Sequence, residues 1–209
     1  MSLAYRISAF NRRRKYRKFL LALDPQPATS ILDVGFTEIE YSASDNFLEN
    51  NYPYPDKITA LGVDQARLFR ERYPQVRAVS YDGEKFPFAD QEFDIVWSNA
   101  VLEHVGGREA QIFFLREIKR VGRRAFITTP NRNFPIEIHT RTPFLHLLPK
   151  RIFDRYLRLI GKSWATGNYM NLLTIRTLQE RLAAAGITNY KIIKNRLAGF
   201  VMDLVVVID

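Results

Sequence analysis

Apolar and polar positions along the chain fall into blocks of strand and helix length. A short, mostly apolar run, Ser30 to Val34, contains one carboxylate at Asp33 and stops at Gly35, which predicts a buried strand that ends in a turn. Further apolar runs predict strands over 57–63, 76–79, 92–98, 124–128, 190–194 and 202–207. Helical periodicity predicts helices that end near residue 23 and that cover 65–73, 108–121 and 175–185.

Strands and helices alternate over most of the chain, and this order predicts the fold class. Alternation of this kind is typical of an α/β protein with a doubly wound, mostly parallel sheet and helices on both faces. We expect seven strands, the last two forming an antiparallel C-terminal hairpin. The 209 residues, 46% of them hydrophobic, suffice for one α/β domain.

The expected domain covers residues 28–209. One further segment precedes it, and one insert interrupts its pattern of strands and helices. A basic helical extension covers residues 1–27 and is stopped by two prolines, Pro25 and Pro27. An insert at about 133–171 fits no sheet pattern and leads from the fifth strand towards the helix at 175–185. We expect this insert to cover an acceptor site.

The formal net charge of +9 comes largely from two clusters in which basic and apolar residues are interleaved. They are Arg6, Arg12, Arg13, Arg14, Lys15, Arg17 and Lys18, and then Lys150, Arg151, Arg155, Arg158 and Lys162. Both clusters are candidates for basic amphipathic helices. One interpretation is that both helices simply expose their basic faces to solvent. The alternatives are that these faces contact an anionic membrane surface, a polyanionic substrate or, as the third alternative, nucleic acid.

Composition removes several classes of site. The absence of cysteine excludes disulfides and thiolate metal sites. His139 and His146 lack the spacing of metal ligands, so we expect no metal site. The longest apolar runs have strand length, and no secretory signal pattern is present. We expect a cytoplasmic protein, with peripheral contact at the inner membrane surface left open.

Small or polar residues stand at the carboxyl ends of five consecutive predicted strands. Ligands of such sheets bind beyond these ends, near the point where the strand order reverses. The residues are Asp33, Gly35, Asp64, Asp82, Gly83, Ser98, Asn99, Thr129, Pro130 and Asn131.

Five sequence blocks at these positions resemble a known family. They are LDVG (32–35), GVD (62–64), YDGEKFPFADQEFDIVWSNAVLEHV (81–105), REIKRVGRRAFITTPNR (116–132) and LTIRTLQERLAAAGI (173–187). In order and spacing they are similar to the class I S-adenosylmethionine-dependent methyltransferases, in particular the small bacterial methyltransferase type 11-like members. The resemblance covers roughly residues 28–208 and implies a Rossmann-like fold with S-adenosyl-L-methionine as cofactor.

The resemblance also implies roles for the residues at the strand ends. Asp33 and Gly35 would form the floor of the cofactor pocket. Asp64, with Gln65 beside it, would accept hydrogen bonds from the ribose hydroxyls, although Asp64 also suits a helix N-cap. Asp82 and Gly83 would meet the adenine amino group and ring edge, or form a plain turn. Ser98 and Asn99 would lie beneath the methionine part.

The opening loop, Gly35-Phe36-Thr37-Glu38, departs from the family pattern, which has a second glycine where this chain has Glu38. The segment between Asp33 and Asp64 is also longer than usual. One outcome is an altered, working pocket in which Phe36 and Glu38 line the site and Glu38 or Asp45 contacts the cofactor's ammonium group. The other is a non-catalytic protein that retains the fold.

Methyl transfer needs alignment of acceptor, methyl group and sulfur more than it needs a catalytic side chain. A hydroxyl acceptor would be helped by a base, and His104 with Glu103 are the candidates, although His104 equally suits a structural position at a helix start. From the insert we expect a small or lipid/glycan-linked acceptor that is partly apolar, carries phosphate or carboxylate and is methylated at oxygen. An RNA-modifying methyltransferase is the remaining alternative, and the oligomeric state stays open.

Overall fold

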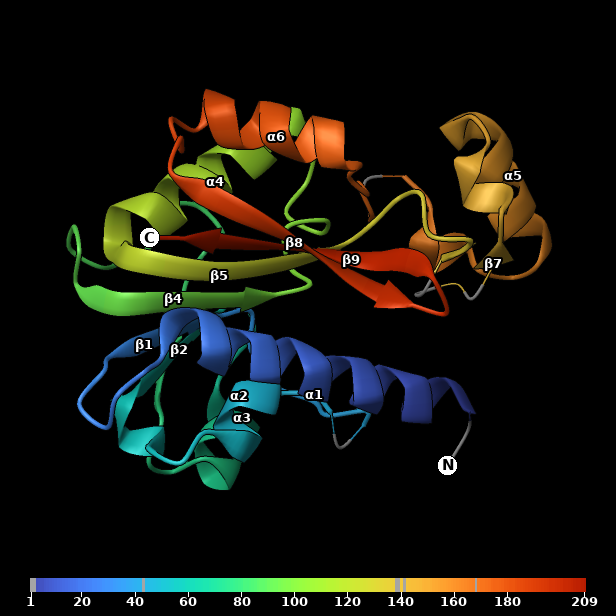
Figure 1. Cartoon of the computed structure of the whole chain (residues 1–209). Helices are drawn as coiled ribbons and strands as arrows, with labels where there is room; N and C mark the ends of the chain where they lie inside the picture. The colour runs from blue at the N-terminus through green and yellow to red at the C-terminus, as the bar shows by residue number, and fades with distance from the viewer. Residues whose placement is uncertain (1–2, 43, 138–139, 141, 168) are drawn as a thin grey trace. The chain divides into compact units, whose positions relative to one another are not determined.

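The computed structural model describes residues 3–42, 44–137, 140, 142–167 and 169–209. Its main sheet has seven strands in the order β3-β2-β1-β4-β5-β9-β8 (Figure 1). The strands are β1 (Ile31–Val34), β2 (Ile58–Gly62), β3 (Arg77–Ser80), β4 (Phe93–Asn99), β5 (Gly122–Pro130), β8 (Tyr190–Leu197) and β9 (Phe200–Ile208). The predicted Rossmann-like sheet, mostly parallel with a C-terminal antiparallel pair, is confirmed.

The chain divides into two compact units, which we describe separately. The first unit contains residues 1–99, 117–127 and 207–209, and the second contains 100–116 and 128–206. The predicted cofactor residues all belong to the first unit, whereas Glu103 and His104 belong to the second.

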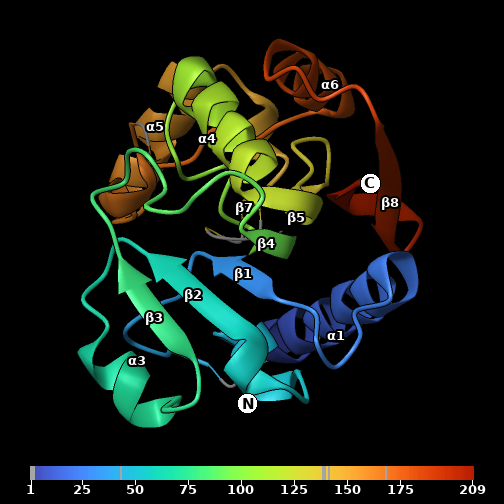
Figure 2. The same ribbon diagram turned by 90° about the vertical axis from the view of Figure 1, so that its left-hand side faces the viewer.

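In the first unit, β1 lies between β2 and β4, and all of these pairings are parallel (Figure 2). Because both faces of a central parallel strand are covered, all four residues of β1 are buried, which explains its nearly unbroken apolar run. In register, Val34 pairs with Leu61 and Ser98, so the strand ends lie at one edge of the sheet. The short helices α2 (Phe47–Asn51) and α3 (Arg67–Arg72) also belong to this unit.

The basic N-terminal helix α1 (Leu3–Leu23) contributes to the core of the first unit. Phe19 is fully buried, and its ring centroid lies 4.9 Å from that of Trp97 and 5.6 Å from that of Phe126. Leu23 is also buried, and its carbonyl oxygen accepts a hydrogen bond from Arg124. The helix ends at Leu23 as predicted, next to Asp24 with positive φ and the two prolines.

The second unit contains the insert, and here one expectation was wrong. Residues 133–171 were expected to hold no sheet, but β6 (Ile136–Glu137) pairs with β7 (Thr142–Pro143) in an antiparallel ladder. Strands of two residues are too short to leave an alternating pattern. The insert continues into α5 (Lys150–Leu159), whose inner face joins Phe153 and Leu157 to a small apolar cluster with Ala165 and Met170.

The remaining elements follow the sequence closely. Helix α4 spans Arg108–Val121 as predicted, and α6 spans Ile175–Ala184 with Thr174 accepting a cap hydrogen bond from the Thr177 backbone. β8 and β9 are joined at Ala198 and Gly199, both with positive φ, as a tight hairpin requires. Within the part of the chain that is described, no helix is both long and apolar enough to cross a membrane.

Candidate cofactor-binding site

The turn after β1 is tied directly to the neighbouring strand. Gly35 has φ +110°, and its N–H donates a 2.7 Å hydrogen bond to the carbonyl of Leu61 in β2. The next side chain, Phe36, turns into the core and packs on Phe69 of α3 with 4.5 Å between ring centroids. A Cβ on Gly62 would lie 2.8 Å from the Phe36 ring, so this ring needs a glycine at position 62.

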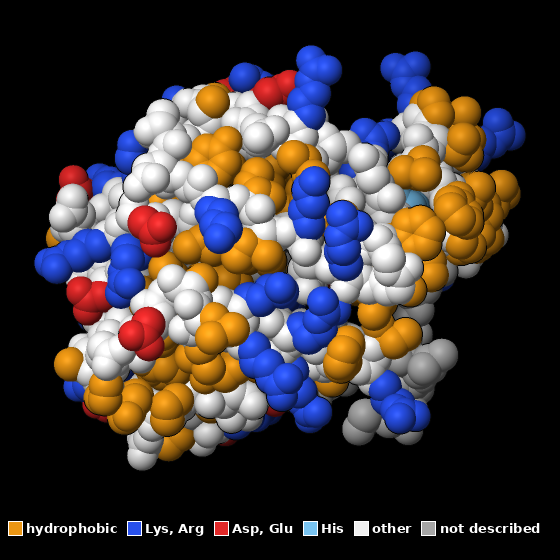
Figure 3. All heavy atoms as spheres, in the orientation of Figure 1, with side chains coloured by type: hydrophobic (Ala, Val, Ile, Leu, Met, Phe, Trp, Pro, Cys, Tyr) orange, Lys and Arg blue, Asp and Glu red, His pale blue; other side chains and the backbone are white. Residues whose placement is uncertain are grey.

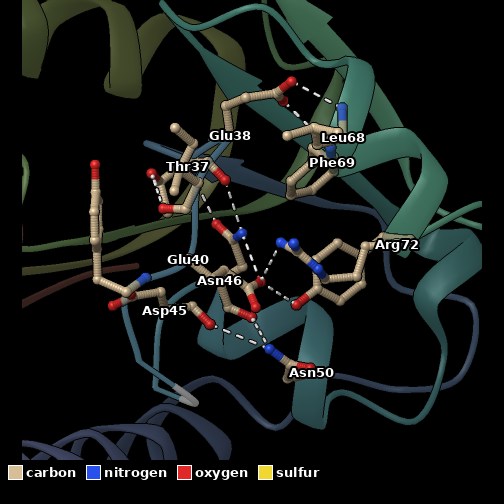
Figure 4. A network of polar contacts seen from close by, with 12 residues as sticks. Thr37, Glu38, Glu40, Asp45, Asn46, Asn50, Leu68, Phe69 and Arg72 are labelled. Atoms are coloured by element: carbon tan, nitrogen blue, oxygen red, sulfur yellow. Dashed lines mark hydrogen bonds and ion pairs between the residues drawn. The ribbon is translucent and has the colours of Figure 1, made fainter.

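The side chain that replaces the family's second glycine is directed to a helix. The Glu38 carboxylate accepts hydrogen bonds from the backbone N–H groups of Leu68, at 2.8 Å, and Phe69, at 3.2 Å (Figure 4). These are first-turn amides of α3, which have no partner inside the helix and favour a negative charge. Glu38 is not among the residues of positive φ, so its backbone has no need of a glycine.

Glu38 also links the loop to the end of β2. Its backbone N–H donates a 3.3 Å hydrogen bond to Oδ2 of Asp64. Asp64 and Gln65 are both exposed at this edge, so they can meet a ligand there. The loop and the predicted ribose-binding carboxylate are therefore held together by the protein itself.

Asn46 organises the rest of the rebuilt loop (Figure 4). Its amide group exchanges two 2.9 Å hydrogen bonds with the backbone of Thr37 and donates a third to Glu40. The Glu40 carboxylate also accepts from the Tyr73 hydroxyl and pairs with Arg72 at 3.2 Å. Burial and this carboxylate raise the pKa of the Tyr73 hydroxyl, which keeps it protonated as a donor.

Asp45 also acts within the loop. Its carboxylate accepts hydrogen bonds from the backbone of Tyr41 and Ser42 and lies 3.5 Å from the Arg12 guanidinium. The predicted contact between the cofactor's ammonium group and Glu38 or Asp45 remains a prediction. In the structure both carboxylates are already engaged by protein donors.

Asp33 lies in a buried acidic pair. Its carboxyl group is beside that of Glu49 in α2, and both residues are more than nine-tenths buried. Burial and the neighbouring acid raise the pKa of Asp33 well above its usual value, with Arg12 opposing the shift. Burial likewise raises the pKa of Glu49. Sequence reasoning missed Glu49 and Arg12 because their partners are remote in sequence and Arg12 resembles a surface charge.

The turn after β3 has the form predicted for it. Oδ1 of Asp82 accepts a 2.9 Å hydrogen bond from the backbone of Glu84, and Gly83 has φ +88°. A Cβ on Gly83 would lie 3.7 Å from Val63, which places this turn beside the end of β2. Asp82 and Gly83 are exposed there, with room for a ligand.

The Phe86-Pro87-Phe88 loop places two aromatic rings next to this turn. Phe86 and Phe88 are buried, and Arg120 holds both of their carbonyl groups by hydrogen bonds of 2.9 and 2.6 Å. Glu117 accepts the Phe86 N–H and pairs with Arg120, which lowers the pKa of the Glu117 carboxyl against the effect of burial. Packing accounts for both rings.

Ser98 lies at the end of β4 beside Val34. It is completely buried, and its Oγ has no hydrogen-bond partner among the described residues. An unsatisfied buried hydroxyl costs free energy, so one at a strand end is a candidate ligand contact. Asn99, the next residue, is half-buried.

In the second unit, His104 has a defined orientation. Its Nδ1 donates a 2.9 Å hydrogen bond to the carbonyl of Tyr169, which leaves Nε2 as the basic nitrogen. Nε2 lies 3.9 Å from Glu103, whose other carboxylate oxygen accepts from Thr129. Of the remaining histidines, His139 lies outside the described residues, and the described residues hold no cluster of three potential metal ligands.

A family model and several solved structures match this chain. The family model, described as a methyltransferase domain, matches residues 46–125. The fold of the chain is the one found in S-adenosylmethionine-dependent methyltransferases. None of the curated proteins compared with it matches.

Solved methyltransferase structures share the fold at low sequence identity. A Thermotoga maritima S-adenosylmethionine-dependent methyltransferase, titled a possible histamine N-methyltransferase, is 13% identical with a TM-score of 0.63, covering 99% of this chain and 91% of that one. The Burkholderia thailandensis 1,6-didemethyltoxoflavin-N1-methyltransferase, with bound S-adenosylhomocysteine, is 18% identical with a TM-score of 0.58, covering 96% and 78%. A geranyl diphosphate C-methyltransferase from Streptomyces coelicolor is 13% identical with a TM-score of 0.56, covering 94% and 78%.

S-adenosylmethionine is the cofactor of the methyltransferases that share this fold, and the residues at the strand ends of this chain fit it. The edge offers an exposed carboxylate at Asp64, a turn at Gly83 without a Cβ, and the unsatisfied hydroxyl of Ser98. The Glu38 side chain, which stands where the family has its second glycine, is bound to the backbone of α3 and so is directed away from the cofactor position.

The buried carboxyl pair of Asp33 and Glu49 predicts that the stability of the protein depends on pH. A carboxyl whose pKa is raised by folding holds its proton more tightly in the folded chain. Its contribution is therefore complete below the ordinary carboxyl pKa and is lost as the pH rises through the raised value. We expect Glu49→Gln to stabilise the protein near pH 8 by on the order of 1 kcal/mol and to have less effect near pH 4.5.

Thermal unfolding of both proteins across this pH range measures the difference. Glu71→Gln is the matched control, because Glu71 is mostly exposed and pairs with Arg67 in the preceding turn of α3. An effect of Glu49→Gln that is the same at every pH would contradict a shared buried proton.

Proposed function

We propose that the chain transfers a methyl group from S-adenosylmethionine to an oxygen of a small or lipid/glycan-linked acceptor. The observation that carries the cofactor half of this proposal is the hydrogen-bonded link from the Glu38 backbone to Asp64. With the Glu38 side chain on α3, the link keeps the loop after β1 beside the ribose-binding position without a second glycine.

In this proposal Asp64 accepts hydrogen bonds from the ribose hydroxyls with the oxygen that Glu38 leaves unoccupied. Asp82 and the Gly83 backbone meet the adenine, while Ser98 and Asn99 contact the methionine part. Asp33 acts beneath the site through its backbone and its buried pairing with Glu49. The cofactor supplies a methyl group already activated by the positive sulfur, so the protein mainly orients the acceptor and excludes water.

His104 is our candidate for the base. When the hydroxyl of an acceptor is methylated, it loses its proton, and Nε2 of His104 would accept that proton. The Tyr169 carbonyl fixes the proton on Nδ1, which keeps Nε2 available for this step. The nearby Glu103 carboxylate stabilises the imidazolium that results.

Cofactor binding is tested by calorimetric titration with S-adenosylhomocysteine. We expect saturable binding that is weakened at least tenfold by Asp64→Asn, since hydrogen bonds to a charged group contribute about 1.5–3 kcal/mol. Asp56→Asn is the matched control, because Asp56 is exposed before the start of β2, at its opposite end. Absence of binding by the unmodified chain would refute the enzyme and favour the non-catalytic alternative.

The role of His104 is tested by substitution with asparagine, whose amide can still donate to the Tyr169 carbonyl but lacks the basic Nε2. We expect kcat to fall by about 10²-fold or more, with loss of the acidic limb of the pH profile. Binding of S-adenosylhomocysteine should stay unchanged. An unaltered pH profile would leave His104 a structural residue.

The acceptor class is inferred from the exposed face of the insert. Large apolar side chains gather over the region of α5 with Lys and Arg at its margin (Figure 3). The exposed members are Phe144, Leu147, Leu148, Ile152, Leu159, Ile160, Trp164 and Tyr169. An apolar face rimmed by Arg151, Arg155 and Arg158 suits the surface of an anionic membrane.

Two further observations support this acceptor class. Helix α1, the other basic helix, buries Phe19 and Leu23 within its own unit, so much of its apolar side is already used. One of the similar solved structures is a methyltransferase in complex with geranyl diphosphate, an apolar chain that carries phosphate. We infer that the insert brings the protein to a lipid surface where the acceptor is presented.

Vesicle co-sedimentation tests this surface. We expect binding to vesicles containing phosphatidylglycerol at low salt and loss of binding at high salt. Leu159→Glu should weaken binding roughly tenfold, because burial of a leucine contributes about 1.5–3 kcal/mol. Leu21→Glu is the matched control, since Leu21 is as exposed as Leu159 but lies on α1. Equal losses in both variants, or no binding at low salt, would refute the membrane role.

A further inference from the structure

A cavity of about 280 Å³ lies within the second unit, and its lining is strongly basic. Arg108, Arg132, Lys150 and Arg181 contribute to its wall, whereas none of the described lining residues is acidic. Like-charged side chains repel one another when they converge without an anion. The cavity is therefore arranged for a negatively charged ligand.

The basic groups come from separate elements, which makes their convergence a product of the fold. Arg108 begins α4, Lys150 begins α5, Arg181 belongs to α6 and Arg132 follows β5. The first turns of α4, α5 and α6 all contribute lining residues, and helix N-termini add partial positive charge. Each of these three helices has ten or more residues.

Protein carboxylates neutralise these cations only in part. Lys150 pairs with Asp154 at 3.4 Å, and Arg108 pairs with Glu109. Arg181 lies 4.0 Å from Glu180, and its Nε donates to the Gln111 side chain. Arg132 is exposed and no carboxylate is seen to pair with it in the described chain.

His146 gives a second, independent indication of a ligand. It lines the cavity and is 94% buried. Its Nε2 donates a 2.9 Å hydrogen bond to the Arg132 carbonyl. Its Nδ1 is buried and has no partner among the described residues. A buried nitrogen without a partner costs free energy, which a ligand hydroxyl that donates a hydrogen bond to it would recover.

Part of the cavity wall is apolar. Phe153, Leu148 and Met170 contribute to the lining together with the cations. The volume is at the lower end of the range for small-molecule sites, so it suits a head group with a short apolar part rather than a whole lipid.

We propose that this cavity binds a phosphate group attached to an apolar body. A phosphate offers three or four oxygens and up to two negative charges, so it can meet more of the four cations at once than a carboxylate can. This inference rests on the proposed function, because it names the part of the acceptor that the second unit recognises. Arg132 supplies a direct ionic contact, the Nδ1 of His146 accepts a hydrogen bond from a P–OH group of the singly protonated phosphate, and Phe153 forms part of the apolar wall.

The first test compares phenyl phosphate, inorganic phosphate and benzoate by calorimetry with the full chain at low ionic strength. We expect phenyl phosphate to bind at least tenfold more tightly than either of the others. Benzoate binding as tight as phenyl phosphate, or no saturable binding of phenyl phosphate, would overturn the proposal.

The second test locates the site. Arg132→Gln should weaken phenyl phosphate binding at least tenfold, the loss expected for a charge-assisted hydrogen bond of about 1.5–3 kcal/mol. Arg176→Gln is the control, because Arg176 belongs to α6, a helix that contributes to the cavity wall, but its side chain is 90% exposed and pairs with Glu180. Equal weakening by both variants would mean that phenyl phosphate is attracted by the overall positive charge of the protein, and it would refute binding in this cavity.

An NMR readout reports on the cavity independently of activity. Phenyl phosphate should shift one of the imidazole signals of the three histidines, and that signal should be missing in His146→Gln. Glutamine keeps a donor for the Arg132 carbonyl while removing Nδ1. A shift that persists in this variant would overturn the contact.

Titration of the same proteins with S-adenosylhomocysteine separates the two proposals. Retained cofactor binding without phenyl phosphate binding would refute the cavity alone. Phenyl phosphate binding without cofactor binding would support the cavity and refute the methyltransferase activity.

Discussion

The hydrogen bonds between the Glu38 carboxylate and the first turn of α3 fix the course of the loop after β1. They satisfy two helix amides that need an external acceptor, and they hold the loop backbone where its N–H reaches Asp64. Phe36 fills the space beneath, against Phe69. The site therefore depends on an anchor between a loop and a helix about thirty residues further along the chain.

Polar groups buried around this anchor limit how the loop can move. Asn46 has a left-handed backbone conformation, and its side-chain amide forms hydrogen bonds with Thr37 and Glu40. These bonds join the start of the loop to the residues just before α2. Arg12 connects the N-terminal helix to the same region through Asp45. The first unit thus uses a basic residue of α1 as part of the support for the cofactor edge, in addition to the apolar packing of that helix.

The sequence predicted most of the elements because their signals are local. Helix α4 has the predicted bounds, and the glycine and polar residues at strand ends lie where parallel strands stop. The support of the site was not predictable in the same way. Glu38 looked like an obstacle to the cofactor because its partners, Leu68 and Phe69, are remote in sequence. Likewise, nothing around His146 in the sequence indicates that Arg108, Arg132 and Arg181 converge beside it.

The packing of Phe36 on Gly62 has a consequence for how sequences with this loop can vary. In the usual pattern the backbone needs a position without a side chain within the loop, whereas here the corresponding requirement falls on strand β2, where a Cβ would collide with the ring. Positions 36 and 62 are therefore constrained as a pair, so that an aromatic residue at one excludes every residue except glycine at the other. A search that looks only for the glycine-rich loop would pass over chains of this type, whereas the pair Phe36 and Gly62 would mark them.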